Sequence, residues 1–317
     1  MDSQQILHTL EAERLTLQAR QKKLIPWLIL LPIALAVIAS LLFNAPGWLF
    51  GGGLGIMYSL ALKEFKIEQP FKKLKERVRS KLIGLFMSTY FPDVTFRYGF
   101  EGKLAKTHLK NTKLIRPDIY EEEDVLEGTY KNNPFYISEI NLKNKGSKNK
   151  THTIFKGILF RFTVSKKSFP LSRIQSKPNL LKKWFSDFIE DPEFGFWAES
   201  KDHGRFREDI RTLAPFIRHL AAQQGDVRIH LDGDQVTMMM ESDMKFLDEP
   251  TPSVSQTFLN EKYFVSMGRQ LHTLLFIIDA FVEDLQTNDI EERLELIAEE
   301  ELKIPAQPIV LEKFIQN

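Results

Sequence analysis

The longest apolar stretch of the chain lies near its beginning, where no Asp, Glu, Lys, Arg or His occurs from Leu24 to Leu62. Its first part, Leu24 to Phe43, is a run of 20 uncharged residues, and a helix of that length crosses a hydrocarbon core of about 30 Å. The second part, Ala45 to Leu62, is of similar length, and Asn44 to Gly47 has the residue types of a tight turn. The pattern predicts a transmembrane helical hairpin over residues 24–62.

Glycines and flanking charges indicate how this hairpin packs and lies in a membrane. Gly51 and Gly55 form a GxxxG spacing, which allows close helix approach within the hairpin or between protomers. Trp27 and Trp48 stand at span ends, where interfacial aromatic anchors belong. Basic residues flank the hairpin on both sides and its turn is uncharged, so we expect a multi-pass protein of the bacterial inner membrane with both termini cytoplasmic. These basic residues are Arg14, Arg20, Lys22 and Lys23 before the hairpin, and Lys63, Lys66, Lys72, Lys73, Lys75, Arg77, Arg79 and Lys81 after it.

Two other interpretations of the apolar segment stay open. Ala34, Leu35 and Ala36 supply the A-x-A triplet of a signal-peptide cleavage site. Against this, a second apolar stretch follows at once, and the leading segment is long for a signal peptide. The segment also fits a buried helical hairpin inside a soluble protein.

The segments beside the hairpin and at the end of the chain have helical periodicity. Residues 1–23 are predicted to form an amphipathic helix, which lies on the membrane surface or joins a short coiled coil. Residues 63–97 are predicted to form a basic juxtamembrane helix, whose charges orient the protein or attract anionic headgroups. Residues 287–317 are predicted to form an acidic helical tail, with a Glu-rich stretch that packs on the domain or on a partner.

Residues 98–286 change to short β segments broken by turn residues, without regular alternation of strands and helices. One hairpin is predicted from Val125–Tyr130 and Phe135–Leu142 across Lys131 to Pro134. A second is predicted from Val227–Leu231 and Gln235–Glu241. The predicted fold class is therefore α+β: a soluble cytoplasmic domain with an antiparallel sheet and flanking helices, which follows the membrane hairpin.

Other segments of this domain are predicted individually. Ile154–Val164 is a largely buried strand pair or one long strand bent at Gly157, and Leu180–Ile189 is a short helix or strand. Arg205–Gln224 and Phe258–Leu285 are predicted helices with apolar faces.

Composition narrows the classes of function. The chain has 43 Lys and Arg against 42 Asp and Glu, so its net charge does not indicate a partner, and no nucleic acid is expected. It has no cysteine, which excludes structural disulfides, thiolate zinc sites and a cysteine nucleophile.

Several phrases of the second half resemble the bacterial family known as domain of unknown function 3137. They are Phe155–Ile158, Glu190–Phe194, Leu213–Phe216 and the hairpin around Gly233, within a match that spans roughly Tyr120 to Phe246. The resemblance implies an N-terminal membrane hairpin joined to a soluble domain, and it implies no settled activity.

The sequence departs from that pattern at two places. Gly195 to Ser200 stands where relatives have a more acidic, tyrosine-containing stretch, and Ala214 stands in place of a threonine.

Candidate chemistry is sparse. The seven histidines occur singly with no HxH or HxxxH pair, and no GxSxG, Walker or Rossmann phrase occurs. Asp232, Gly233 and Asp234 are better explained by a β-turn than by a calcium loop. The sequence thus predicts no catalytic, cofactor-binding or metal site and no cofactor.

The leading hypothesis is a non-enzymatic, membrane-tethered binding or scaffold protein. Its expected partners are the lipid bilayer and a protein, or a second copy bound through the helical hairpin. One alternative is a membrane-associated hydrolase or transferase assembled from distant residues, with Asp191, Glu193, His203 and His230 as the residues to test. Another alternative is a structural subunit of a membrane assembly.

Overall fold

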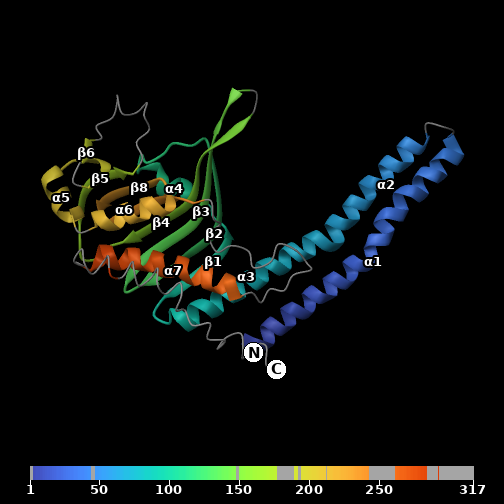
Figure 1. Cartoon of the computed structure of the whole chain (residues 1–317), viewed down its shortest axis with the longest axis horizontal. Coiled ribbons are helices and arrows are strands. Elements are labelled where there is room, and N and C mark those ends of the chain that lie inside the picture. Colours follow the sequence, from blue (N-terminus) through green and yellow to red (C-terminus); the bar gives the residue numbers. More distant parts are fainter. Residues whose placement is uncertain are drawn as a thin grey trace. The chain divides into compact units, whose positions relative to one another are not determined.

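The chain divides into two compact units in the computed structural model, shown in Figure 1. The described part of the first unit lies within Met1–Leu85, and that of the second lies within Phe86–Asp248 and Glu261–Ile309. The structure describes residues 3–43, 47–147, 150–176, 189–191, 194–211, 213–242, 261–283 and 292. The expected turn at residues 44–46, most of the predicted segment Leu180–Ile189, residue Glu193 and nearly all of the predicted tail lie outside these residues.

The first unit consists of long helices. Helix α1 spans Ser3–Phe43 without interruption, so the predicted amphipathic segment and the first apolar segment form a single helix. Helix α2 (Gly47–Lys63) continues through a π-helical turn, η1 (Glu64–Glu68), into α3 (Gln69–Tyr90). The predicted helix over residues 63–97 therefore ends early, because Pro92 follows and the chain enters a strand at Thr95.

The start of α1 packs beside the chain that follows α2. Leu10 and Leu17 of α1 are buried, as are Ile67 of η1 and Leu74 of α3. Arg77 of α3 donates hydrogen bonds to both carboxylate oxygens of Glu13 in α1. This arrangement fits the coiled-coil alternative for residues 1–23 rather than a helix that lies free on a membrane surface.

The second unit contains an antiparallel nine-stranded sheet in the order β1-β2-β3-β4-β9-β8-β5-β7-β6, which confirms the predicted α+β class. The β8–β9 hairpin is inserted between β4 and β5. The strands are β1 (Thr95–Glu101), β2 (Ile119–Tyr130), β3 (Asn133–Lys145), β4 (Thr151–Thr163), β5 (Phe169–Gln175), β6 (Ile189–Asp191), β7 (Phe196–Ser200), β8 (Val227–Gly233) and β9 (Gln235–Glu241). The helices are α4 (Ala105–Lys110), α5 (His203–Arg211), α6 (Ala214–Gln224) and α7 (Glu261–Val282).

Both predicted hairpins are confirmed. The β2–β3 turn is shorter than expected, because Tyr130 pairs with Asn133 and leaves Lys131 and Asn132 as a two-residue loop. Both loop residues have positive φ, 48° and 65°, as a type I′ turn requires. In the second hairpin Asp232 pairs with Gln235.

Two other segments differ from or refine the sequence prediction. The expected helix Arg205–Gln224 is two helices, α5 and α6, because Pro215 lacks an N–H and its ring clashes with the carbonyl four residues earlier in a continuous helix. The segment around Gly157 is one long strand. A Cβ at Gly157 would lie 2.0 Å from the Met240 carbonyl oxygen, so this position requires glycine where β9 pairs with β4.

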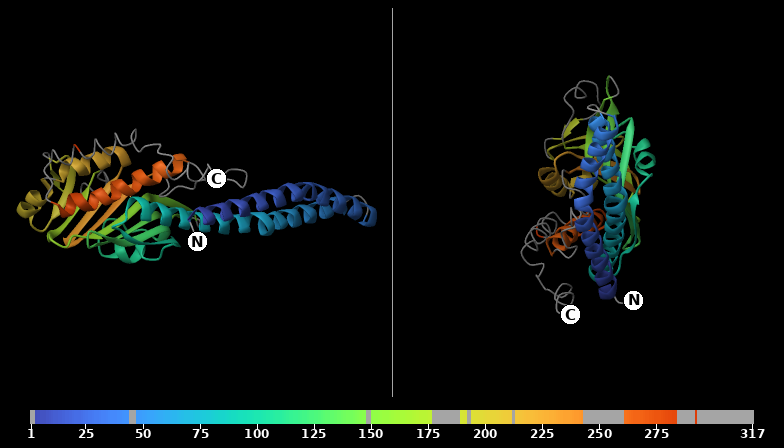
Figure 2. Two further views of the ribbon diagram at one scale, coloured as in Figure 1. Left: turned by 90° about the horizontal axis from the view of Figure 1, so that it is seen from below. Right: turned by 90° about the vertical axis from the view of Figure 1, so that its right-hand side faces the viewer.

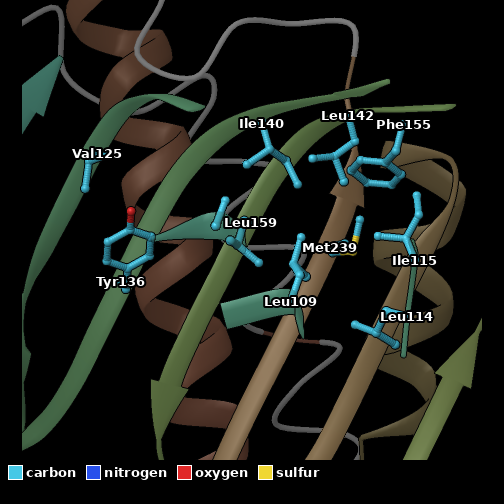
Figure 3. Packing of buried hydrophobic residues seen from close by; sticks show 11 residues of the cluster. Leu109, Leu114, Ile115, Val125, Tyr136, Ile140, Leu142, Phe155, Leu159 and Met239 are labelled. Carbon is cyan, nitrogen blue, oxygen red and sulfur yellow. The ribbon is translucent and has the colours of Figure 1, made fainter. Parts of the chain in front are cut away.

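Helices cover both faces of the sheet (Figure 2). On one face α6 and α7 contribute aromatic rings, among them Phe281, which lies 5.4 Å from Phe162 and 5.9 Å from Phe169 between ring centroids. On the other face α4 and the residues after it form a core, shown in Figure 3. That core consists of Ala105, Leu109, Leu114, Ile115, Val125, Tyr136, Ile140, Leu142, Phe155, Leu159 and Met239.

A buried carboxylate ties α7 to the β2–β3 turn. Asp279 accepts hydrogen bonds from the Tyr130 hydroxyl at 3.0 Å and from Lys131 Nζ at 2.8 Å. Lys131 Nζ also lies 2.7 Å from Glu283. Burial lowers the pKa of Lys131, but the hydrogen bonds to Asp279 and Glu283 outweigh it and raise this pKa above its usual value.

We expect Asp279→Asn to lower the free energy of unfolding of the second unit by about 1.5–3 kcal/mol, since the Tyr130 hydroxyl and the Lys131 ammonium group lose a buried, charged hydrogen-bond acceptor. Glu283→Gln, which changes the more exposed partner of Lys131, should cost less than about 1 kcal/mol. Denaturant titration in mild detergent measures both. Equal losses would show that the buried carboxylate has no special role.

Candidate functional site

The helices α1 and α2 pack through small residues. A Cβ at Gly51 would lie 2.3 Å from the Leu35 carbonyl oxygen, and one at Gly55 would lie 2.5 Å from Pro32 Cα. A Cβ at Gly53 would meet nothing within 4 Å. Ser59, one turn beyond Gly55, is also buried. The GxxxG spacing therefore serves packing within the hairpin, which was one of the two expected uses.

The outer surface of this helix pair is apolar. Trp27 is 64% exposed, and large apolar side chains along both helices are exposed as well. They are Ile25, Ile29, Leu30, Ile33, Val37, Ile38, Leu41, Leu42, Leu54, Ile56, Met57, Tyr58 and Leu60. Such a concentration of exposed apolar side chains is typical of a surface that contacts a membrane or another protein.

The two apolar helices differ in length. Over the described residues, α1 is the one helix long and apolar enough to cross a membrane, in its segment Thr9–Leu42. Helix α2 has 17 residues, which is at the short end for a span. The structure thus establishes an N-terminal apolar helix of membrane length, and it does not establish the predicted second span.

A row of polar side chains crosses the sheet on the face that α4 partly covers. Residues directly opposite each other on neighbouring strands share a face, so the register places these side chains side by side. The row consists of Arg97, Glu127, Tyr136, Arg161, Thr237, His230, Arg173 and Glu199, from β1, β2, β3, β4, β9, β8, β5 and β7. Its two ends are ion pairs, Arg97 with Glu127 and Arg173 with Glu199.

Glu122 and Arg161 organise the contacts between this row and α4. Glu122 accepts hydrogen bonds from the Tyr136 hydroxyl at 2.6 Å and from the Ser138 hydroxyl at 2.8 Å. It also accepts hydrogen bonds from the backbone N–H groups of Leu104 and Ala105 at the start of α4. Arg161 donates to the Gln235 side-chain oxygen and lies 2.5 Å from His108 Nδ1.

Burial perturbs the titration of this network. Burial, with the neighbouring Arg161 cation adding to it, holds the pKa of His108 below its usual value. Burial likewise lowers the pKa of His230, which is 7% exposed, and Arg173 and Arg161 act in the same direction. Burial and then the Glu122 carboxylate raise the pKa of the Tyr136 hydroxyl.

The structure does not bring the candidate catalytic residues of the enzyme alternative together. Asp191 pairs with Phe196 and so lies on the α6–α7 face, while His230 lies in the polar row on the opposite face. Asp191 forms an ion pair with Arg207 and accepts the Phe194 backbone N–H, as a turn-shaping residue does. His203 is exposed at the start of α5, and Glu193 lies outside the described residues. Within the part of the chain described, no three His, Asp or Glu side chains are grouped to hold a metal ion.

Two members of the acidic run Glu121–Asp124 have structural contacts and are not simply solvated. Glu122 caps α4, and Asp124 is buried and accepts a hydrogen bond from the Tyr98 hydroxyl at 2.6 Å. The cause is a β-bulge between Glu123 and Leu126, which changes the alternation of inward and outward side chains. In the sequence, the one sign that these carboxylates could have structural contacts is their position at the start of a predicted strand.

Comparison with known proteins finds a likeness to a mycobacterial protein of known structure. It is described as "crystal structure of the mycobacterial trehalose monomycolate transport factor A, TtfA", with 12% identity and a TM-score of 0.33, and the match covers 63% of this chain and 94% of that one. A likeness this distant carries no conclusion about activity. No family model and no curated protein matches the chain, and the resemblance to the domain of unknown function 3137 family stays a prediction.

We expect Gly55→Leu to destabilise the helix pair by about 1–3 kcal/mol, because the larger side chain overlaps Pro32. Gly53→Leu is the matched control, since its side chain enters open space. Melting of the full chain in mild detergent separates them. Similar melting temperatures for both variants would contradict the packing described above.

We expect the second unit to lose stability as pH falls below about 6.5, because the unfolded chain takes up protons that the partly buried His108 and the buried His230 resist. His108→Gln keeps an acceptor for Arg161 and should reduce the dependence by at most about 1.4 kcal/mol per pH unit. His203→Gln, at an exposed position, should leave it in place. Denaturant titrations at pH 7.5, 6.5 and 5.5 test this. An unchanged slope in His108→Gln would show that His108 does not contribute.

Proposed function

We propose that this chain is a membrane-anchored, non-enzymatic binding protein, whose helices α1 and α2 both lie in the inner membrane and whose α+β unit works on the cytoplasmic side. The observation that carries the proposal is the exposed apolar surface of the α1–α2 pair. A bilayer supplies apolar surroundings for such a surface on all sides.

The packing of α2 on α1 supports placing both helices in the bilayer. Gly51 lies against Leu35, and Gly55 lies against Pro32, in the middle of the apolar part of α1. Because α2 packs this closely on the apolar part of α1, both helices would lie at the same depth in the bilayer. The short length of α2 is compatible with a span, because its helix continues into η1 and its backbone hydrogen bonds do not end at the interface.

Basic residues that flank the apolar parts of α1 and α2 support a cytoplasmic location for both flanks. Lys22 and Lys23 are exposed on α1, and Lys63 lies at the end of α2, where it forms an ion pair with Glu68 at 2.7 Å. Basic residues next to a span remain in the cytoplasm.

The polar network supports binding rather than catalysis. Its charged side chains hold one another or cap a helix, and Asp191 and His230 lie on opposite faces of the sheet. Self-association through the glycines is not favoured, since Gly51 and Gly55 already contact α1.

Topology is tested with reporters in the full chain. A fusion after Asn317 should report the cytoplasm, one inserted at Ala45 should report the periplasm, and the protein should resist alkaline extraction from membranes. A cytoplasmic signal at Ala45 would overturn the proposed arrangement of both helices. Cleavage after Ala36 would favour the signal-peptide interpretation instead.

A further inference from the structure

One surface of the α+β unit is rich in exposed cations. Residues 103–116 contain five basic side chains and no acidic residue. All five are exposed, and within the described part of the chain none of them forms an ion pair. They are Lys103, Lys106, Lys110, Lys113 and Arg116.

The fold orients this segment, which we term the basic ridge (residues 103–116). Ala105, Leu109, Leu114 and Ile115 are buried in the core on the sheet, so the lysines between them project away from it. Within α4, Lys106 and Lys110 are four residues apart and so lie on the same side of the helix, while Lys103 precedes the helix and Lys113 follows it. Glu122 accepts the backbone N–H groups at the start of α4 and so fixes the segment to the sheet.

Leu104 gives the basic ridge an apolar component. It is 43% exposed, and among the described residues of the second unit it is the one exposed large apolar side chain. Lysines around an exposed leucine are the composition of a surface that lies at a membrane interface.

Several other cations of this unit have an anionic neighbour. Lys131, Lys143, Arg173 and Arg228 each form an ion pair with a nearby carboxylate. The basic ridge instead concentrates like charges, which repel one another unless an anionic partner is present.

We propose that the basic ridge binds the anionic lipid headgroups of the membrane that anchors the chain; this inference rests on the proposed function. Lysine ammonium groups suit phosphate headgroups as compact point charges. The membrane anchor keeps headgroups at high effective concentration, so contacts too weak for a free protein are populated. A nucleic acid fits less well, since the ridge's single aromatic ring, His108, packs against Tyr136 and leaves no exposed ring for bases.

The test uses the full chain in nanodiscs of neutral phosphatidylcholine or with added phosphatidylglycerol, and measures acylation of each lysine by mass spectrometry. We expect Lys103, Lys106, Lys110 and Lys113 to react at least about threefold more slowly in the anionic nanodiscs. This protection should disappear in 0.5 M salt, which is roughly a 4 Å Debye length.

Paired charge reversals locate the effect. Lys106→Glu with Lys110→Glu should abolish protection of Lys103 and Lys113. Lys166→Glu with Lys201→Glu makes the same change in charge at exposed lysines elsewhere on the unit and should leave protection intact. The inference is overturned if the ridge lysines of inserted protein are acylated equally fast in both kinds of nanodisc. It is also overturned if added RNA protects these lysines in neutral nanodiscs. Failure to insert at all would instead overturn the proposed function.

Discussion

The pairing of β4 with β9 joins the two halves of the sheet, and most of the second unit depends on it. The meander β1–β4 meets the β8–β9 hairpin through the register from Gly157–Glu241 to Thr163–Gln235. That register aligns the polar row across eight strands and brings Met239 into the core beneath α4. A side chain at Gly157 would collide with the β9 backbone, so one position controls whether the two halves can meet.

Local features of this fold could be predicted from the sequence, and nonlocal ones could not. Alternating apolar residues and turn residues identified both hairpins, because their information lies within about ten positions. The pairing of β4 with β9 joins residues roughly 80 apart, and no periodicity encodes such a register. The same limit explains why Glu122, Arg161 and His108 were missed as a connected group. Their contact depends on strand order and on a bulge.

Two groups of charged residues in the second unit differ in their contacts. One group is held by partners, as Asp279 is by Tyr130 and Lys131, and stabilises one arrangement of the elements. Those of the basic ridge have no partner within the described residues and do not stabilise the fold. In the first unit α2 packs on α1 through the small residues Gly51 and Gly55, which allow close contact between the two helix backbones.

The insertion of β8–β9 into the middle of the sheet has a consequence for biosynthesis. Strand β4 ends at Thr163, but its neighbour β9 is complete only at Glu241, about 80 residues later. At about 5–20 residues per second, ribosomes need roughly 4–16 s to supply it. Throughout that interval the nascent sheet has an open edge of apolar strand while α1 and α2 have already left the ribosome. Chaperone engagement during translation would therefore be concentrated on β4 and would end when β9 arrives.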